Sequence, residues 1–415
     1  MSPLRSGRHF LQIPGPTNVP DRVLRAMDAP TMDHRGPDFA RLNLEVLEGV
    51  KAVWGTSGPV VIYPGSGTGA WEAALVNTLS PGDRVLAFET GHFATLWRDM
   101  AQRLGLRVEW VPGNWRRGAS TAAAQELLRG DPEHTIRAVM VVHNETSTGV
   151  TSRVGDMRAV MDAAEHPALL LVDTISSQGS IPFSFDEWKV DVAVGCSQKG
   201  LMLPPGLGFN VVSDKALRAS RTATLPRSYW DWGPWLEAGA LGYTPSTPAT
   251  NLLYGLREAL HMLGEEGLPA VFARHERHAE ATRRAVDAWG LEVLCEDPRE
   301  LSPVLTAILL PEGHDADEVR RVILERFDMS LGAGLGRLKG SVFRIGHLGD
   351  FNDLALAGTL CGVEMGLGLA GVPFERGGVD AALAFLAEPL AETADGGAAG
   401  PSHEAMAHAG AEPAV

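Results

Sequence analysis

Short apolar segments alternate with amphipathic helical patterns along residues 60–212, and this alternation constrains the fold more than any other feature of the chain. Each segment is apolar almost throughout, which is typical of a strand buried on both faces of a parallel sheet. In the helix expected over residues 38–54, Phe39, Leu42 and Val46 recur on one face. Strands that alternate with helices predict an α/β fold with right-handed crossovers. The expected strands are residues 60–63, 84–88, 137–142, 169–172, 190–194 and 208–212.

The pattern changes near residue 250. Two long helical stretches, 251–266 and 270–289, precede weaker strand patterns at 306–310 and 342–345, with a helix expected over 315–327. This order predicts a smaller α+β domain. The chain then becomes rich in Ala, Gly, Glu and Pro, a composition that favours disorder. The expected division is an N-terminal segment (1–20), a large domain (21–255), a small domain (256–375) and a disordered tail (376–415).

Charge and cysteine content exclude several classes of protein. The net charge of −15 argues against nucleic acid or an anionic membrane surface as the main partner. No apolar run reaches the roughly 18 residues that a membrane span needs, and the N-terminus has no apolar signal segment. The 3 cysteines are widely spaced, which suggests neither a disulfide framework nor a zinc site. The sequence therefore predicts a cytoplasmic enzyme that takes small molecules and holds no metal.

A glycine-rich segment, PGSGTGAWEAAL at residues 64–75, follows the first expected strand and opens a helix. Gly65, Gly67 and Ala70 match the dinucleotide-binding pattern, and Glu89 ends the next strand where a ribose-binding carboxylate belongs. A nicotinamide-dependent dehydrogenase is therefore one hypothesis. Hydroxyl groups between the glycines, together with backbone N–H groups at a helix N-terminus, also suit a phosphate monoester. A tight turn with a Ser/Thr cap remains the structural alternative.

Two further strand ends favour the phosphate monoester. Asp173 ends the segment LLLVD, and Lys199 follows the segment VDVAVGCSQ. A partly desolvated lysine has a lowered pKa and becomes nucleophilic, and an aspartate can pair with a protonated pyridine nitrogen. A phosphate cradle, a Schiff-base lysine and a pyridinium aspartate are the groups that pyridoxal phosphate (PLP) requires. Taken singly, Asp173 is also compatible with a helix cap and Lys199 with a solvated surface position.

At these residues the chain resembles the class V, fold-type I aminotransferases, and most closely their serine–glyoxylate and alanine–glyoxylate branch. The resemblance implies a large, doubly wound, mainly parallel sheet domain and a smaller α+β C-terminal domain. It covers nearly all of the chain before the tail. The motifs that carry it are PGPTNVP (14–20), MDHRGPDF (32–39), PGSGTGAWE (64–72), GHFATLWRDMAQRLG (91–105), VVHNETSTGV (141–150), VDTISSQGS (172–180), GCSQKGLMLPPGLG (195–208), LLYGLREAL (252–260) and VFRIGHLGD (342–350).

The resemblance also implies cofactor-binding roles for individual residues. Ser66, Gly67, Thr68 and Gln198 are expected to bind the PLP phosphate, although the family often has His where Thr68 stands. The other assignments are Phe93 stacked on the pyridine ring, Thr146 bonded to the phenolic oxygen, Asp173 at the ring nitrogen, and Lys199 as Schiff-base lysine and proton shuttle.

Substrate and subunit contacts follow from the same resemblance. Arg344 lies between apolar residues on an expected strand, and the family uses this arginine to bind the substrate carboxylate in a bidentate manner. The N-terminal segment 1–20, which contains PGPTNVP, is expected at the edge of the active site, and Gly15 is expected to bring backbone close to the substrate, unless PGPT is only a rigid turn. Tyr243 and Thr247 resemble residues that relatives lend to the neighbouring subunit of a homodimer with shared active sites. His347 is expected to be structural.

The predicted reaction is transfer of the amino group of an L-amino acid, with L-serine preferred, to glyoxylate by a ping-pong mechanism. It gives hydroxypyruvate and glycine. Alanine or aspartate as donor is the alternative within this activity, because all three share the carboxylate that Arg344 would bind. A cysteine desulfurase would need a reactive cysteine on a mobile loop, and Cys196, Cys295 and Cys361 do not lie in such a loop. A PLP-binding regulator would need a basic DNA-binding segment, which the sequence does not supply.

Overall fold

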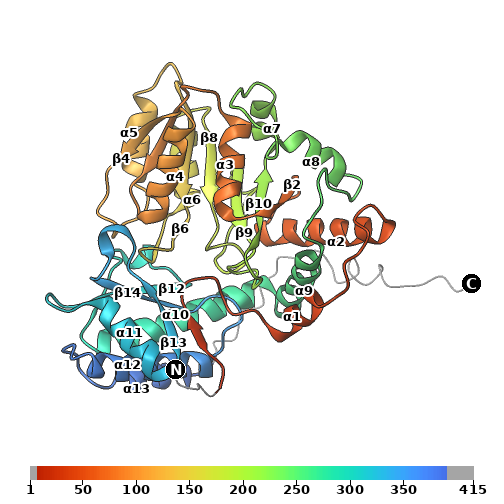
Figure 1. Ribbon diagram of the computed structural model, residues 1–415. Coiled ribbons are helices and arrows are strands. Elements are labelled where there is room, and N and C mark those ends of the chain that lie inside the picture. Colours follow the sequence, from red (N-terminus) through yellow and green to blue (C-terminus); the bar gives the residue numbers. More distant parts are fainter. Residues whose placement is uncertain (1–6, 390–415) are drawn as a thin grey trace, which may run out of the picture.

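The computed structural model describes residues 7–389 and contains a large domain built on a seven-stranded sheet (Figure 1). Every strand pairing in this sheet is parallel except the two that involve β10, so the sheet is mainly parallel, as the sequence predicts. Its strands, in spatial order, are β2 (Val60–Gly65), β10 (Gly206–Val212), β9 (Val192–Cys196), β8 (Leu169–Asp173), β5 (Ile136–Val142), β3 (Arg84–Phe88) and β4 (Arg107–Val111).

The six strands predicted from apolar runs are all present, with bounds that differ by at most two residues. The strand β4 was missed. It lies at the edge of the sheet, and none of its residues is fully buried. An edge strand does not need the continuous apolar run by which the inner strands are found, and its sequence, RVEWV, alternates instead.

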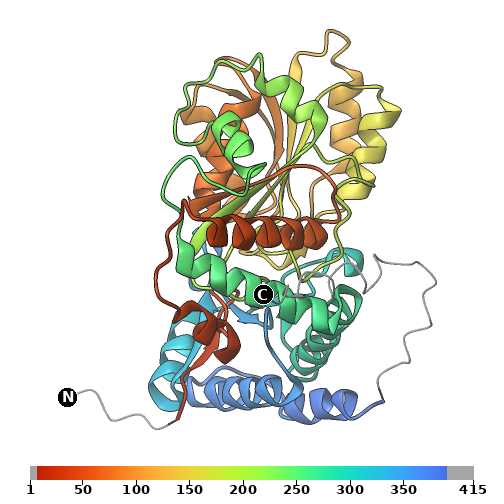
Figure 2. The ribbon, with the colours of Figure 1, turned by 90° about the vertical axis from the view of Figure 1, so that its right-hand side faces the viewer.

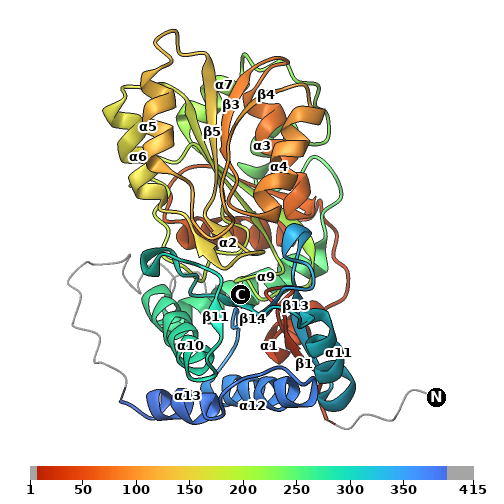
Figure 3. The same ribbon diagram turned by 90° about the vertical axis from the view of Figure 1, so that its left-hand side faces the viewer.

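Helices cover both faces of the large sheet because residues of each strand point alternately to opposite sides. Val61 of β2 packs in one apolar cluster, and its neighbour Ile62 packs in the other. The first face carries α3 (Gly67–Thr78), α4 (His92–Arg103), α7 (Asp214–Ser220) and α8 (Trp232–Gly239). The second carries α2 (Pro37–Trp54), α5 (Thr121–Arg129), α6 (Val154–Ala163) and α9 (Thr250–Glu266), and Figure 3 shows α3 and α4 opposite α5 and α6.

The small domain is a five-stranded, mostly antiparallel sheet backed by helices. Its strands, in spatial order, are β1 (Phe10–Gln12), β13 (Met329–Ala333), β14 (Val342–Gly346), β12 (Leu305–Leu309) and β11 (Glu292–Val293). The helices are α10 (Leu268–Ala288), α11 (Ala316–Phe327), α12 (Asp353–Leu369) and α13 (Gly378–Leu386). In Figure 2 the blue helices α12 and α13 run in a row along the side of this domain that faces away from the large domain.

Two features differ from the predicted division of the chain. The N-terminal segment starts in the small domain, since β1 pairs with β13, and then crosses to the large domain, where α1 (Asp21–Met27) packs on α9. Residues 378–386, expected in a disordered tail, form α13, which packs along α10 and buries Ala382. Local composition did not reveal this helix because its packing partner lies about a hundred residues earlier. Residues 390–415 of the predicted tail lie outside the described residues.

No helix within residues 7–389 combines the length and the apolar character that crossing a membrane would require.

Candidate active site

Apart from Tyr243 and Thr247, the predicted site residues of the large domain lie at or after the carboxyl ends of its strands, at the edge that faces the small domain (Figure 1). Asp173 is the last residue of β8, and Lys199 follows β9 by three residues. Arg344 lies on β14 of the small domain and reaches across to the large domain, where it donates a hydrogen bond to Thr146. The structure therefore brings residues from both domains together in the arrangement typical of ligand sites in α/β proteins.

Lys199 is buried, with 8% of its surface exposed. Its Nζ donates a hydrogen bond to the carbonyl oxygen of Pro14. Burial lowers the pKa of Lys199 to about 8; the positive charge of Arg344 acts in the same direction, and Cys196 and Asp173 oppose it. A neutral amine is therefore available in mildly alkaline solution, as a Schiff-base lysine requires, and the solvated alternative is excluded.

The backbone around Lys199 is tied to the N-terminal segment. Thr17 donates from its N–H to the carbonyl of Gln198 and from its hydroxyl to the carbonyl of Lys199. Gly15 has a φ of +115°, and a Cβ there would lie 2.5 Å from Nζ of Lys199. Gly15 therefore lies close to the side chain of Lys199, and its predicted approach to the substrate stays a prediction. The sequence predicts PGPTNVP at the edge of the site, but it did not predict the hydrogen bonds that Pro14 and Thr17 make with Lys199.

Asp173 is held by two donors and is only 4% exposed. Oδ1 accepts from the N–H of Ile175 at 2.7 Å, and Oδ2 accepts from Nε1 of Trp71 at 3.1 Å. Burial raises the pKa of Asp173 to about 7; Glu145 raises it further, while both hydrogen bonds and Lys199 lower it. The capping alternative is correct in part, because Asp173 caps a turn although no helix begins there.

The raised pKa of Asp173 predicts that the free energy of unfolding of the apoprotein depends on pH. Below pH 3.8, the ordinary pKa of an aspartate, the carboxyl is protonated in both the folded and the unfolded state, whereas between pH 3.8 and about 7 only the unfolded chain loses the proton. Stability is therefore lost as pH rises through this window, by on the order of 4 kcal/mol above pH 7. We therefore expect the difference in melting temperature, apo Asp173→Asn minus apo wild type, to increase from pH 5 to pH 8. Calorimetry of the two apoproteins measures this difference.

The comparison of these two proteins isolates Asp173. Buried histidines such as His143 and His275 have lowered pKa values that do not depend on Asp173, so they cancel in the difference, whereas Lys199, whose pKa of about 8 Asp173 raises, is coupled to it and titrates at the upper end of the range. An unfavourable contact between the new amide and Trp71 would add an offset that does not depend on pH. A difference in melting temperature that stays constant across this pH range would contradict the prediction.

The glycine-rich segment forms a cradle at the start of α3. Ser66 is the N-cap residue, and its Oγ accepts from the N–H of Gly69 at 3.4 Å. The first N–H groups of a helix have no partner within the helix, which makes a helix N-terminus a favourable site for an anion. Gly67 is buried, and a Cβ there would lie 2.5 Å from Cδ1 of Ile175. Gln198 adds a buried side-chain oxygen that has no hydrogen-bond partner within residues 7–389. The N–H groups of the cradle fit a phosphate, whereas the unpaired oxygen of Gln198 is an acceptor and needs a donor, so Gln198 could bind a phosphate only through its amide N–H groups.

Glu89, the residue that supported the dehydrogenase hypothesis, is engaged elsewhere. Its carboxylate accepts from Nε1 of Trp115 at 3.1 Å and from the N–H of Gly113 at 3.3 Å. It also pairs with Arg337 of the small domain at 3.4 Å. Both carboxylate oxygens of Glu89 therefore have partners within the protein, one of them from the small domain, and neither is left to bind a ribose.

Phe93 and Thr146 are linked by a carboxylate that the sequence analysis missed. Glu145 is fully buried and accepts hydrogen bonds from the N–H groups of Phe93 and Ala94, at 3.3 and 3.0 Å, at the start of α4. It also accepts from the hydroxyl of Ser147 at 2.6 Å. A carboxylate at a helix N-terminus is stabilised by the helix dipole. Glu145 therefore fixes the loop of Thr146 against the helix of Phe93.

Arg344 has no carboxylate partner among the ion pairs of the described chain, so an ion pair with Asp or Glu of the chain does not account for this buried charge. Its Nε donates to the carbonyl of Ala333 at 2.8 Å, and its Nη1 donates to the carbonyl of Thr146 at 2.6 Å. The side chain is 7% exposed, and burial lowers its pKa to about 10. Nη2 makes no hydrogen bond within residues 7–389 and is free to bind an anion.

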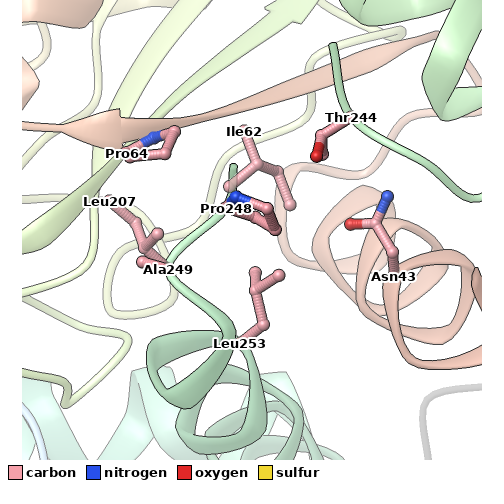
Figure 4. Close-up of a pocket in the computed structure, with 8 residues that line it drawn as sticks. All are labelled: Asn43, Ile62, Pro64, Leu207, Thr244, Pro248, Ala249 and Leu253. Atoms are coloured by element: carbon pink, nitrogen blue, oxygen red, sulfur yellow. The ribbon is translucent and has the colours of Figure 1, made fainter. Parts of the chain in front are cut away.

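Within residues 7–389, no contact brings Tyr243 or Thr247 to Lys199. Their loop lies beyond α8 and is anchored by Asn43 of α2, which donates to the carbonyl of Gly242 at 3.2 Å. Figure 4 shows Thr244 and Pro248 of the loop grouped with Asn43 around a small cavity. Thr247 is exposed, and Tyr243 packs in part against the core. The single chain leaves their predicted contact with a neighbouring subunit untested.

The cysteines do not supply a reactive thiol at this site. Cys196 is buried, and burial raises its pKa to about 12; burial also raises the pKa of Cys295 to about 11. Cys361 is exposed on α12 of the small domain. His347 is fully buried and hydrogen-bonds to Thr306 at 3.1 Å, which agrees with a structural role.

The chain is similar in sequence and in structure to known aminotransferases. The sequence model described as aminotransferase class-V matches residues 9–335. A serine–glyoxylate aminotransferase of Methylorubrum extorquens is 52% identical over 94% of this chain and 98% of its own length. An L-aspartate–glyoxylate aminotransferase of Paracoccus denitrificans is 47% identical over 89% and 94%. The crystal structure of pyridoxamine–pyruvate aminotransferase from Mesorhizobium loti is similar with a TM-score of 0.86 and 27% identity, over 92% of this chain and 97% of that one.

Proposed function

The chain belongs to the class-V aminotransferase family, whose members depend on PLP, and we propose that it transfers the amino group of L-serine to glyoxylate. The products are hydroxypyruvate and glycine. The observation that carries the donor is the identity of 52% over 94% of this chain to a serine–glyoxylate aminotransferase. The buried amine of Lys199 and the buried carboxylate of Asp173 support the chemistry.

When bound, PLP supplies an aldehyde that takes up the amino group and a ring that stabilises negative charge at the substrate Cα. Lys199 offers an amine with a pKa of about 8, so its Nζ can accept the Cα proton and return it to another atom. Asp173 provides the negative charge for the ring nitrogen. Ser66, Gly67, Thr68 and Gln198 would hold the phosphate, with Phe93 on the ring face and Thr146 at the phenolic oxygen.

Nη2 of Arg344 is the free donor for the substrate carboxylate, and Gly15 borders the same space. A ping-pong sequence follows from a single site: serine leaves as hydroxypyruvate before glyoxylate binds. The direct test incubates the holoenzyme with L-serine alone and measures hydroxypyruvate. One equivalent per subunit supports the proposal, and no product without glyoxylate contradicts it.

The donor is tested by steady-state kinetics with glyoxylate as the acceptor. We expect kcat/KM to be highest for L-serine among L-serine, L-alanine and L-aspartate. L-aspartate is the second candidate, because a relative at 47% identity is an L-aspartate–glyoxylate aminotransferase. A higher kcat/KM for aspartate or alanine would overturn serine as the donor and leave the transamination itself intact.

Replacement of Arg344 by lysine is expected to lower kcat/KM roughly 100-fold, mostly through KM. Lysine keeps the charge but cannot hold the carbonyls of Ala333 and Thr146 and also offer a planar pair of donors to a carboxylate. Arg320→Lys is the matched control, because Arg320 also donates to a backbone carbonyl, that of Leu331 at 2.8 Å, but pairs with Asp317. Equal losses in both variants would contradict the role of Arg344.

A homodimer in the cytoplasm completes the proposal. Ser66 and Thr68 of the cradle are exposed in the single chain, as is Thr247 of the loop after α8. A second subunit that contributes Tyr243 and Thr247 would close the cradle over the phosphate. The free cysteines suit a reducing compartment. Sedimentation of the holoenzyme measures the subunit number, and a monomer with full activity would contradict shared sites.

A further inference from the structure

Trp71 makes the side-chain contact that fixes the orientation of Asp173. The two oxygens of Asp173 accept one hydrogen bond each, from the backbone of Ile175 and from the indole of Trp71. The first donor is present whatever the residue at 175. The second depends on the tryptophan, and the two together set the plane of the carboxylate. Remaining lone pairs of the carboxylate stay free for another donor.

Trp71 is itself held rigidly between the elements of the site. It is 2% exposed and lies on α3, one turn after the glycine-rich cradle. Its ring stacks on that of Trp97 of α4, with ring centroids 5.8 Å apart and an angle of 16°. The helix α4 begins at His92, next to Phe93. Trp71 thus connects the cradle, the carboxylate of Asp173 and the helix that carries the predicted stacking ring.

We propose that Trp71 is a positioning residue, whose indole N–H holds Asp173 as an oriented carboxylate for the ring nitrogen of PLP. This inference rests on the proposed transaminase function but not on the identity of the amino donor. Asp173 needs such support because burial and the nearby Glu145 both favour its protonated form, and among the described residues only Lys199 supplies an opposing charge. Cys196, the other titratable neighbour, is a neutral thiol at physiological pH.

The molecule provides a matched control. Trp97 belongs to the same stacked pair and is 1% exposed, but its Nε1 has no hydrogen-bond partner within residues 7–389. Phenylalanine at either position removes the same atoms and leaves a similar cavity. Only at position 71 does the change remove a donor to Asp173.

The test compares Trp71→Phe with Trp97→Phe by two measurements that use no amino donor. The first is the pH titration of the protonated carboxyl band of Asp173 in the apoenzyme, followed by infrared difference spectroscopy and assigned by its loss in Asp173→Asn. The second is the dissociation constant of PLP from the apoenzyme. Loss of a hydrogen bond to a charged group is expected to move the midpoint of Asp173 up by about one pH unit and to weaken PLP binding roughly 10-fold in Trp71→Phe alone.

Equal behaviour of the two variants, or no shift in either, would overturn the proposal. If Trp71→Phe does not fold, β-(3-benzothienyl)alanine introduced at position 71 keeps the bicyclic ring and replaces the N–H by sulfur. The same shifts are then expected, and their absence would be decisive. Failure of serine as the donor leaves both measurements unchanged, whereas failure of PLP to bind the wild-type apoenzyme would remove the proposed function itself.

Discussion

Replacement of Lys199 by alanine is expected to lower kcat by at least ~10⁴-fold while the protein stays folded. The amine is the only group within the described site that combines burial with a pKa lowered to about 8, so no neighbouring side chain can take over its covalent and proton-transfer work. The fold should survive because the change removes a buried ammonium, whose desolvation is unfavourable, together with one hydrogen bond to Pro14. We expect the melting temperature of the apoprotein to change by less than about 5 °C.

Two measurements make this prediction specific. Borohydride reduction of the holoenzyme followed by peptide mass spectrometry should place the PLP adduct on Lys199 in the wild type. Lys339→Ala is the control, because Lys339 is exposed and follows a turn of the small domain. Full activity of Lys199→Ala, or an adduct on another lysine of the wild type, would refute the assignment.

The strands of the large sheet could be predicted from the sequence because they are buried on both faces. Such burial produces a continuous apolar run, and β3 was predicted with its exact bounds. The same reasoning could not find β4, which lies at the edge, or α13, whose Ala-rich sequence is stabilised by packing on α10. Tertiary contacts, rather than a local sequence pattern, stabilise β4 and α13.

Site residues divide in the same way. Asp173 and Lys199 could be predicted because each lies at or just after the end of an apolar strand, where a charged side chain needs an explanation. The contacts that hold these two side chains in place could not be predicted from the sequence. Pro14 and Lys199 are separated by 185 residues, and Trp71 and Asp173 by 102 residues. Trp71 and Glu145 look like ordinary core and loop residues until the fold brings them against Asp173 and Phe93.

Replacement of Gly15 by alanine is expected to lower kcat/KM about 10³-fold with a smaller effect on stability. A Cβ at position 15 would lie 2.5 Å from both Cδ and Nζ of Lys199, a distance that real side chains do not tolerate, so the lysine has to leave its position. The backbone cannot yield easily, because Thr17 binds the carbonyls of Gln198 and Lys199, and β1 is paired with β13.

A positive φ alone also destabilises alanine, so the experiment needs a control for that effect. Gly313 has a φ of +88° and no atom within 4 Å of its Cβ position, so Gly313→Ala carries the backbone strain without the overlap. We expect both variants to lose roughly 1 kcal/mol of free energy of unfolding and to melt at similarly reduced temperatures. Only Gly15→Ala should lose activity. Kinetics with L-serine and glyoxylate and calorimetry of both proteins measure the two effects separately. Comparable activities would show that the segment before Pro16 does not limit the space around the reactive amine.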